Sequence, residues 1–444
     1  MEDQKLKADD LRVDTLGEPI IPSPLGLNTE EGDQTANYIA DSRTVLYDVD
    51  RDDVQAMVRA GIEPPAFQMA GPREKIFFDG AVVRAAIVTC GGLCPGINNV
   101  IRTLVMELHY RYGVRSILGI RYGYRGFIPQ LGYEPIPLTP DLVKDIHEKG
   151  GTMLSSSRGE QSTSAIVDFL QKKRISMLFA IGGDGTLRGA WEIYCEAKKR
   201  GLPISIIGIP KTIDNDISFV ERTFGLETAF AVAAESIRSA HTEALGAPNG
   251  VGIVKVMGRM SGFIAANAAL ALAEVNFVLI PEVPFGLEGP NGLFALIKDR
   301  LEKRDHAVII VAEGAGQEYV KDISGKKDDS GNPVLGDIGM FLKDAIKGYF
   351  KTSGLSVNVK YIDPSYMVRS VAANAHDAIY CIQLAQNAVH AGMAGKTGII
   401  IGQWNGQFTH VPINLACSRR KVLSPEDPLW LSVLEATGQP LKIG

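Results

Sequence analysis

Residues 174–216 read RISMLFAIGGDGTLRGAWEIYCEAKKRGLPISIIGIPKTIDND. The apolar runs at 176–181 and 205–209 predict two buried strands, and the stretch between them predicts a helix that stops at Gly201. Neither run alternates with polar residues, which is typical of parallel strands covered on both faces. A loop rich in glycine or acidic residues follows each run. The stretch therefore predicts a strand–helix–strand unit whose polar loops lie where the strands end.

The same alternation extends in both directions along the chain. Strands are expected at 85–90, 116–120, 251–257, 277–281 and 307–314. A helix after the first of these has an apolar face made of Ile97, Val100, Ile101, Leu104, Val105 and Leu108. A hairpin over 398–413 should turn at Asn405-Gly406, and a polar loop should span 321–336. The pattern predicts the α/β fold class, with two Rossmann-like lobes, mainly parallel sheets and an N-terminal extension.

The expected domains follow from where this alternation begins and ends. The extension covers 1–81 and is rich in proline and acid. The first lobe covers 82–226 and is completed by a segment that returns around 370–417. The second lobe covers 227–369, and a C-terminal segment covers 418–444.

Composition narrows the classes of function. The chain has 444 residues, is 45% hydrophobic and carries a net charge of −5, which weighs against nucleic-acid binding. Residues 1–60 carry a net charge of −8, so the remainder is about +3. The five cysteines are scattered and predict no disulfide framework, and the seven histidines show no metal-ligand spacing. The polar N-terminus and the absence of an apolar stretch long enough to cross a membrane predict a cytoplasmic protein.

Unusual loops follow five of the expected strands. They read GGLCPG, GGDGT, PKTIDND, MGR and AEG. Ligands of open α/β sheets bind beyond the carboxyl ends of the strands, so we expect these five loops to build one site at one edge.

Two of the loops carry the chemistry. In GGDGT, Asp184 offers the hard oxygen that Mg²⁺ prefers, and Thr186 can cap the next helix and donate to phosphate. Lipid kinases and NAD kinases also carry this motif. In PKTIDND, Asp214 is suited to accept a proton from a hydroxyl that attacks phosphorus, with Thr212 and Asp216 beside it.

Together these motifs resemble the 6-phosphofructokinase family. PKTIDND, GGDGT, MGR (257–259), AEG (312–314) and YMVR (366–369) follow in the family's order from about residue 82 onward. The extended N-terminus resembles the long-chain branch, which includes trypanosomatid and plant ATP-dependent enzymes and related pyrophosphate users. The resemblance implies a glycolytic, allosteric transferase that phosphorylates the 1-hydroxyl of fructose 6-phosphate, with ATP as co-substrate and Mg²⁺ as cofactor. It also implies a homo-oligomer, most simply a homotetramer built as a dimer of dimers.

The resemblance implies a role for each matching residue. Asp214 is the catalytic base, and Asp184 holds Mg²⁺. The donor in the first lobe contacts Gly92, Arg158, Gly159, Gly183, Asp184, Gly185 and Thr186. The sugar phosphate contacts Thr212, Ile213, Asp214, Met257, Gly258, Arg259, Glu313, Lys360, Tyr366, Met367, Val368 and Arg369.

Three positions depart from the short-chain bacterial pattern. Tyr366 stands where those enzymes have histidine, and Gly250 where they have arginine. Lys360 stands where they have an arginine that reaches into a neighbouring subunit. The effector site of the short-chain enzymes is therefore not transferred to this chain.

Two positions indicate which phosphoryl donor is used, and one favours ATP while the other favours pyrophosphate. Gly185 is typical of ATP users because it leaves room for the α-phosphate and ribose, whereas pyrophosphate users carry aspartate there. Lys211 is typical of pyrophosphate users. Because room is a necessary condition for a bulky donor, we favour ATP. The alternatives are the pyrophosphate-dependent enzyme, a lipid or NAD kinase, and a non-catalytic regulatory subunit.

Overall fold

The computed structural model describes residues 6–30, 32–320 and 333–444. Their contacts divide the chain into two compact units. The first unit comprises Met1–Thr212, Ile217–Phe224 and Ala372–Arg420. The second comprises Ile213–Asp216, Gly225–Val371 and Lys421–Gly444. Each unit has a sheet covered by helices, which confirms the predicted α/β fold class.

A nine-stranded mixed sheet forms the centre of the first unit. Five neighbouring strands, β16 to β7, are parallel, and antiparallel strands flank them at both edges. The strands β9 and β10 are buried along their whole length, because they are apolar on both faces. In spatial order the strands are β3 (Thr44–Leu46), β4 (Ala66–Met69), β17 (Gln407–Pro412), β16 (Ile399–Trp404), β10 (Ser205–Pro210), β9 (Met177–Gly182), β6 (Arg84–Thr89), β7 (Ser116–Ile120) and β8 (Ile136–Pro137).

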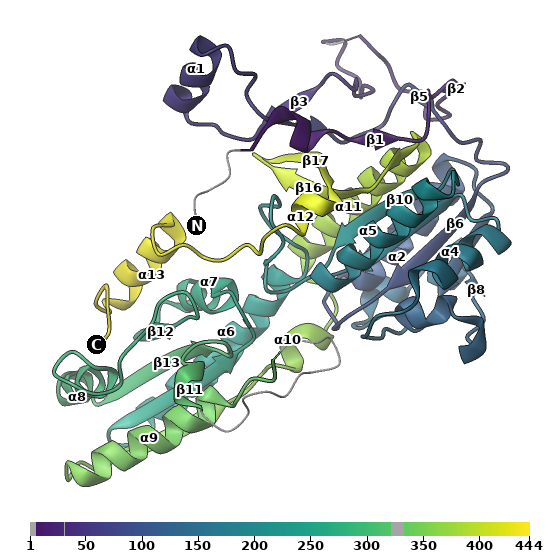
Figure 1. Cartoon of the computed structure of the whole chain (residues 1–444). Helices are drawn as coiled ribbons and strands as arrows, with labels where there is room; N and C mark the ends of the chain where they lie inside the picture. Colours follow the sequence, from purple (N-terminus) through teal and green to yellow (C-terminus); the bar gives the residue numbers. More distant parts are fainter. Residues whose placement is uncertain (1–5, 31, 321–332) are drawn as a thin grey trace. The chain divides into compact units, whose positions relative to one another are not determined.

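Helices cover this sheet, with α4 and α5 running along it in Figure 1. All six residues of the predicted apolar face at 97–108 are buried, and α5 ends just before Gly201, so both predictions are confirmed. The N-terminal region is joined to the later part of this unit by the pairing of β1 (Asp14–Thr15) with β15 (Lys396–Thr397). A second short pair, β2 (Ile21–Pro22) with β5 (Lys75–Ile76), lies within the N-terminal region itself. The helices are α1 (Arg51–Arg59), α2 (Ile97–Met106), α3 (Pro140–Val143), α4 (Thr163–Lys172), α5 (Asp184–Lys199), α11 (Ala375–Met393) and α12 (Ile413–Ala416).

The second unit is built on four parallel strands in the order β12 (Phe277–Leu279), β13 (His306–Ala312), β11 (Gly250–Val256) and β14 (Asn358–Ile362). Its hydrophobic core includes residues of α8 and α9 packed on β11 and β13, and α6 also contacts β11. Figure 1 shows α9 alongside this sheet. The helices are α6 (Leu226–Leu245), α7 (Phe263–Leu272), α8 (Leu293–Arg304), α9 (Ile338–Thr352), α10 (Met367–Ser370) and α13 (Pro428–Thr437).

The expectation of five loops on one edge is wrong. GGLCPG, GGDGT and PKT follow β6, β9 and β10 of the first unit, whereas MGR and AEG follow β11 and β13 of the second. Most of the loop expected at 321–336 lies outside the described residues. The hairpin is confirmed, since β16 and β17 pair on either side of Asn405 and Gly406, both with positive φ. The domain boundaries given above stay predictions.

No helix among residues 6–30, 32–320 and 333–444 is long and apolar enough to cross a membrane. The five cysteines are free thiols, and all but Cys195 are buried.

One carboxylate in the N-terminal region joins two buried cations. Asp41 accepts from Arg73 at 2.6 Å and from Lys396 at 2.7 Å. The side chains of Arg73 and Lys396 are only 7% and 4% exposed, whereas that of Asp41 is 51% exposed. Partial burial works to raise the pKa of Asp41, but the hydrogen bonds from Lys396 and Arg73 outweigh it, so the pKa is lowered. Asp41 therefore stabilises the first unit as an anion.

We predict that Asp41→Asn destabilises the protein by about 3 kcal/mol at pH 7, the low end for breaking a buried pair because Asp41 itself is half exposed. Since the folded pKa of Asp41 is lowered, this contribution is complete above the ordinary aspartate pKa of about 4 and is lost as the pH falls through the folded value. Urea unfolding at pH 7 and below pH 4 measures both effects. Asp299→Asn, which removes an exposed partner of Lys303 on α8, is the control and should change little. Equal stability of the two variants at pH 7 would contradict the prediction.

Candidate active site

Three loops of the first unit lie side by side because β10, β9 and β6 are neighbours in the sheet. Their carboxyl ends carry PKT, GGDGT and GGLCPG. The loop with Arg158 and Gly159 joins them, since Gly91 N donates to Ser157 O at 3.0 Å and the Ser156 hydroxyl donates to Gly91 O at 2.7 Å. The first unit therefore brings together every residue that the sequence assigns to the donor.

The GGDGT loop opens α5 differently from the expectation. The helix starts at Asp184 with Gly183 as its N-cap, so Thr186 lies inside the first turn and does not cap the helix. A side chain at Gly182 would meet Thr186 Oγ1 at 2.1 Å, so the loop closes tightly on this threonine. Its carbonyl oxygen accepts from the buried Tyr124 hydroxyl at 2.7 Å. The amides of the first turn and the positive end of the helix make this loop suited to phosphate.

Arginines surround the carboxylate of Asp184. Arg188, one turn later on α5, lies 3.0 Å from Asp184 Oδ2, and Arg420 lies 3.8 Å from the same atom. Arg188 is itself fixed by a hydrogen bond to Cys417 O at 2.6 Å. Its pKa is raised, mainly by the hydrogen bond to Asp184. A carboxylate and two guanidinium groups at a helix N-terminus form a site that can hold both a cation and phosphate oxygens.

The two donor-selecting positions differ in their surroundings. A Cβ at Gly185 would meet no atom within 4 Å, so this face of the loop is open. Lys211 is 5% exposed, and its ammonium donates to Gly92 O at 2.8 Å. Lys211 thus connects the loop after β10 to the loop after β6. The sequence had linked this lysine only to the choice of donor, and the contact gives it a structural role as well.

The PKTIDND stretch changes units along its length. Thr212 belongs to the first unit, where its carbonyl oxygen accepts from the Thr223 hydroxyl, while Ile213 and Asp214 belong to the second. The Ser261 hydroxyl donates to Asp214 O at 2.7 Å, and Asp214 Oδ1 is shielded from solvent. Asn215 has φ of +54°, a left-handed conformation that asparagine tolerates better than most residues.

In the second unit, the MGR and AEG loops pack backbone against backbone. Gly314 N donates to Gly258 O at 3.1 Å, and a Cβ at Gly314 would lie 1.9 Å from Arg259 O. Gly258 itself has φ of +129°, and a Cβ there would lie 2.4 Å from Ser261 O. Both glycines are therefore required for the close approach that brings Met257 and Arg259 beside Glu313.

Glu313 is, with Asp214, one of two acidic groups among the predicted sugar-phosphate residues of this unit. Burial raises its pKa, and the positive charges of Arg259, Lys255 and Arg369 act in the opposite direction. Three cations of this unit therefore act electrostatically on one carboxylate. Arg259 also donates to Pro333 O. A cluster of guanidinium groups around a carboxylate can bind a phosphate and a hydroxyl of one ligand.

The YMVR stretch follows β14 and forms the start of α10, a single helical turn with Tyr366 as its N-cap. Val368 is buried, while Tyr366 and Met367 are 77% and 60% exposed. The guanidinium carbon of Arg369 lies 4.8 Å from the centre of the Tyr366 ring. The tyrosine that stands where the short-chain enzymes have histidine therefore supports this arginine by a cation–π contact. Both residues come from the same unit as Arg259 and Glu313.

Lys360 lies on β14, and within its own chain its ammonium is 3.5 Å from Glu243 of α6. Both side chains are largely exposed, at 44% and 59%. At Gly250 a Cβ would lie 2.0 Å from Ala244 O, so the arginine of the short-chain pattern has no room there.

Sequence reasoning missed four polar residues at these loops. Arg188 is detectable, because it stands four residues after Asp184 on a predicted helix and such pairs share a face. No sequence pattern could have detected the other three, Arg420, Lys255 and Asp363, because their partners are distant along the chain.

Comparison with known proteins gives one consistent family. A model of the family described as phosphofructokinase matches residues 84–392. The "ATP-dependent 6-phosphofructokinase" of Borreliella burgdorferi is 47% identical over 440 residues, which cover 98% of this chain and 98% of that protein. The "ATP-dependent 6-phosphofructokinase 4, chloroplastic" of Arabidopsis thaliana is 48% identical over 378 residues, which cover 84% of this chain and 71% of that protein.

Solved structures agree on the fold. A structure titled pyrophosphate-dependent phosphofructokinase, from Marinobacter aquaeolei, superposes with a TM-score of 0.66 at 19% identity, covering 82% of this chain and 92% of that one. At that identity the likeness concerns the fold alone. The family match and the near full-length relatives confirm the family inferred from the motifs: the chain belongs to the phosphofructokinase family.

Proposed function

We propose that this chain is an ATP-dependent 6-phosphofructokinase that converts ATP and fructose 6-phosphate into ADP and fructose 1,6-bisphosphate. The observation that carries the proposal is the 47% identity, over nearly the full length of both chains, to a protein named for that activity. The activity is the one that the motifs predicted. The sugar-phosphate motifs argue against a lipid or NAD kinase, and the presence of both Asp184 and Asp214 argues against a non-catalytic subunit.

In this proposal the acceptor is held and deprotonated by residues of the second unit. Arg259 and Arg369 bind the 6-phosphate through charge-assisted hydrogen bonds. Glu313 orients a sugar hydroxyl, and Asp214 accepts the proton of the 1-hydroxyl as that oxygen attacks the γ-phosphorus. The hydrogen bond from Ser261 to Asp214 O supports this role, because it fixes the loop from which the carboxylate projects.

The donor is held by the first unit. The amides at the start of α5 and the arginine of the loop at 157–159 suit the phosphates of ATP. Mg²⁺ would be held by Asp184 together with the phosphates, and when bound it neutralises charge on the transferring group. One carboxylate fits this role, because Mg²⁺ in kinases is bound by one or two carboxylates plus substrate phosphates. Among the described residues no three His, Cys, Asp or Glu side chains form a group that could hold a metal ion by themselves.

The cytoplasmic location, the homo-oligomer and allosteric control expected from the sequence belong to this proposal. Cell fractionation would test the location, and kinetic titration with candidate effectors would test the allosteric control.

For the base, we expect Asp214→Asn to lower kcat by about 10²–10⁴, since asparagine keeps the shape but cannot accept the proton. The KM for fructose 6-phosphate should change little. A coupled assay for ADP measures both, with Asp299→Asn on α8 as a control that should behave as the unsubstituted chain. A near-normal kcat would remove Asp214 from the role of base.

For the donor, the unsubstituted chain should use ATP and should use pyrophosphate poorly or not at all. Gly185→Asp should abolish ATP use by steric clash and like-charge repulsion with the α-phosphate. The fold should tolerate the change, because a Cβ there meets no atom within 4 Å and an acid suits the first turn of a helix.

Gly185→Ala is the matched control, since it adds the Cβ without the charge and should keep most ATP activity. Assays with ATP and with pyrophosphate are run side by side. Robust turnover with pyrophosphate and none with ATP would overturn the choice of donor and leave the acceptor assignment intact.

For the assembly, Lys360 should reach the sugar phosphate of a neighbouring subunit, so the active species should be an oligomer, most simply a tetramer. Sedimentation of the active enzyme tests this, and a fully active monomer would contradict it. Mixing Lys360→Ala with Asp214→Asn subunits should restore part of the activity, because some hybrid sites then combine an intact base with an intact lysine.

A further inference from the structure

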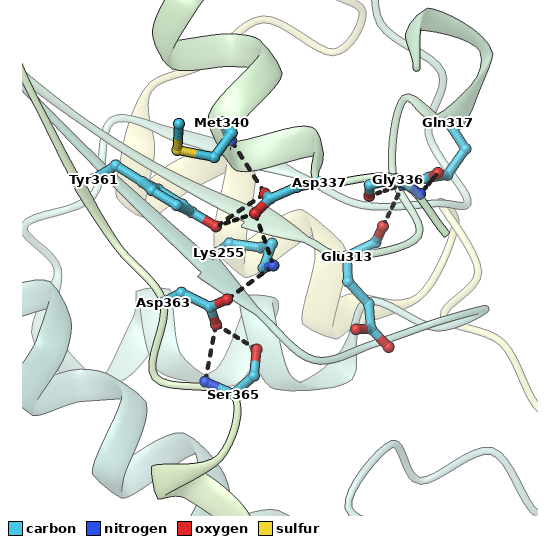
Figure 2. A network of polar contacts seen from close by, with 9 residues as sticks. All are labelled: Lys255, Glu313, Gln317, Gly336, Asp337, Met340, Tyr361, Asp363 and Ser365. Carbon is cyan, nitrogen blue, oxygen red and sulfur yellow. Dashed lines mark hydrogen bonds and ion pairs between the residues drawn. The ribbon is translucent and has the colours of Figure 1, made fainter. Parts of the chain in front are cut away.

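Four residues of the second unit have polar side chains that meet near the MGR and AEG loops (Figure 2). Lys255 is the penultimate residue of β11, and Asp337 precedes α9 as its N-cap. Tyr361 lies in β14, and Asp363 follows that strand. None of these residues belongs to the motifs that identify the family.

Lys255 is the centre of this network. Its side chain is 13% exposed, and its ammonium lies 2.8 Å from Asp363 Oδ2 and 3.5 Å from Asp337 Oδ2. Burial works to lower the pKa of Lys255, but the hydrogen bond to Asp363 and the nearby negative charges outweigh it, so the pKa is raised. The lysine is therefore charged and flanked by two carboxylates.

Both carboxylates are also fixed by the chain around them. Asp337 accepts from the Tyr361 hydroxyl at 2.9 Å and from Met340 N at 3.1 Å. Asp363 accepts from Ser365 N at 3.0 Å and from the hydroxyl of the same residue. Lys255 thus connects three elements, β11, the start of α9 and the turn after β14.

The turn after β14 leads directly to the predicted sugar-phosphate residues. Pro364 O accepts from Met367 N at 2.8 Å and from Val368 N at 3.0 Å, so the position of the turn determines where α10 begins. Arg369 lies on that helix. A shift of Asp363 would therefore move Arg369.

The start of α9 is tied to Glu313 in a similar way. The Gln317 amide donates to Glu313 O at 2.6 Å and accepts from Gly336 N at 2.9 Å, next to Asp337. Figure 2 shows the Glu313 carboxylate turned away from Gln317, so this tie leaves the carboxylate available to a ligand. Lys255 also lies two residues before Met257, the start of the MGR loop.

We propose that Lys255 is a positioning residue of the acceptor site: it holds Asp337 and Asp363 together and thereby sets Arg369 and Glu313, without contacting the sugar phosphate itself. The two carboxylates cancel much of the attraction that the ammonium would exert on a phosphate dianion. Without the lysine, two carboxylates within 3.5 Å of the same point would repel each other and separate. The inference rests on the proposed fructose 6-phosphate site.

Lys255→Met should raise the KM for fructose 6-phosphate about 10- to 100-fold, the loss expected from misplacing binding groups by about 1 Å. The kcat at saturating fructose 6-phosphate and the KM for ATP should change little. Lys255→Arg keeps the charge and should recover most of the affinity. The control is Lys298→Met on α8, which removes an exposed partner of Glu302 and should leave the kinetic constants unchanged.

A triple variant separates positioning from direct contact. Lys255→Met, Asp337→Asn and Asp363→Asn together leave no unpaired charge, and each asparagine can still accept the backbone hydrogen bonds. Because the repulsion is gone, the triple variant should bind fructose 6-phosphate within about fivefold of the unsubstituted chain and better than Lys255→Met alone. Its folding does not depend on that of the single variant.

Two results would overturn the proposal. The first is a folded Lys255→Met variant with an unchanged KM for fructose 6-phosphate. The second is a triple variant whose KM is as high as, or higher than, that of Lys255→Met, which would mean that the ammonium contacts the phosphate directly. If the proposed function itself were wrong, the unsubstituted chain would not turn over fructose 6-phosphate with ATP, so the two failures are distinguishable.

Discussion

Parallel pairing of neighbouring strands is the constraint on which both loop clusters depend, the one in the first unit and the one in the second. In the first unit β9 and β10 pair up to Gly182 and Pro210, so the GGDGT and PKT loops leave the sheet at the same level. In the second unit β11 pairs with both β13 and β14, which places MGR between AEG and the turn that leads to YMVR. A register shift in either sheet would separate these loops and reverse the faces of their side chains.

Each loop cluster is also held by a lysine with little exposure to solvent. Lys211 donates to a carbonyl oxygen of the neighbouring loop in the first unit. Lys255 pairs with two carboxylates in the second. Under the proposed function this difference has a reason. Backbone amides of the first cluster are assigned to phosphates, whereas the second cluster binds with side chains that come from separate elements. Both lysines place a positive charge near loops where an anionic substrate is expected. The contacts described for them, however, are with oxygen atoms of the protein itself.

The sequence predicted the strands, the main helices and the loops that carry the motifs, because apolar periodicity and glycine-rich turns are local signals. It did not predict that α5 begins at Asp184, so that Thr186 does not cap it. Ion pairs such as Asp41 with Lys396 join positions far apart in the chain, and no local pattern encodes them. The same holds for Lys255, whose partners become visible only when β11, β14 and α9 are assembled.

In the proposed function the donor binds on the loops of the first unit and the acceptor on those of the second. A crystal structure of the enzyme with Mg²⁺, fructose 6-phosphate and a non-hydrolysable ATP analogue tests this most directly. We expect the triphosphate at Gly183–Thr186, the sugar phosphate against Arg259 and Arg369, and Lys255 still bound to Asp363. A sugar phosphate on the GGDGT loop, or a nucleotide on the MGR and AEG loops, would contradict it.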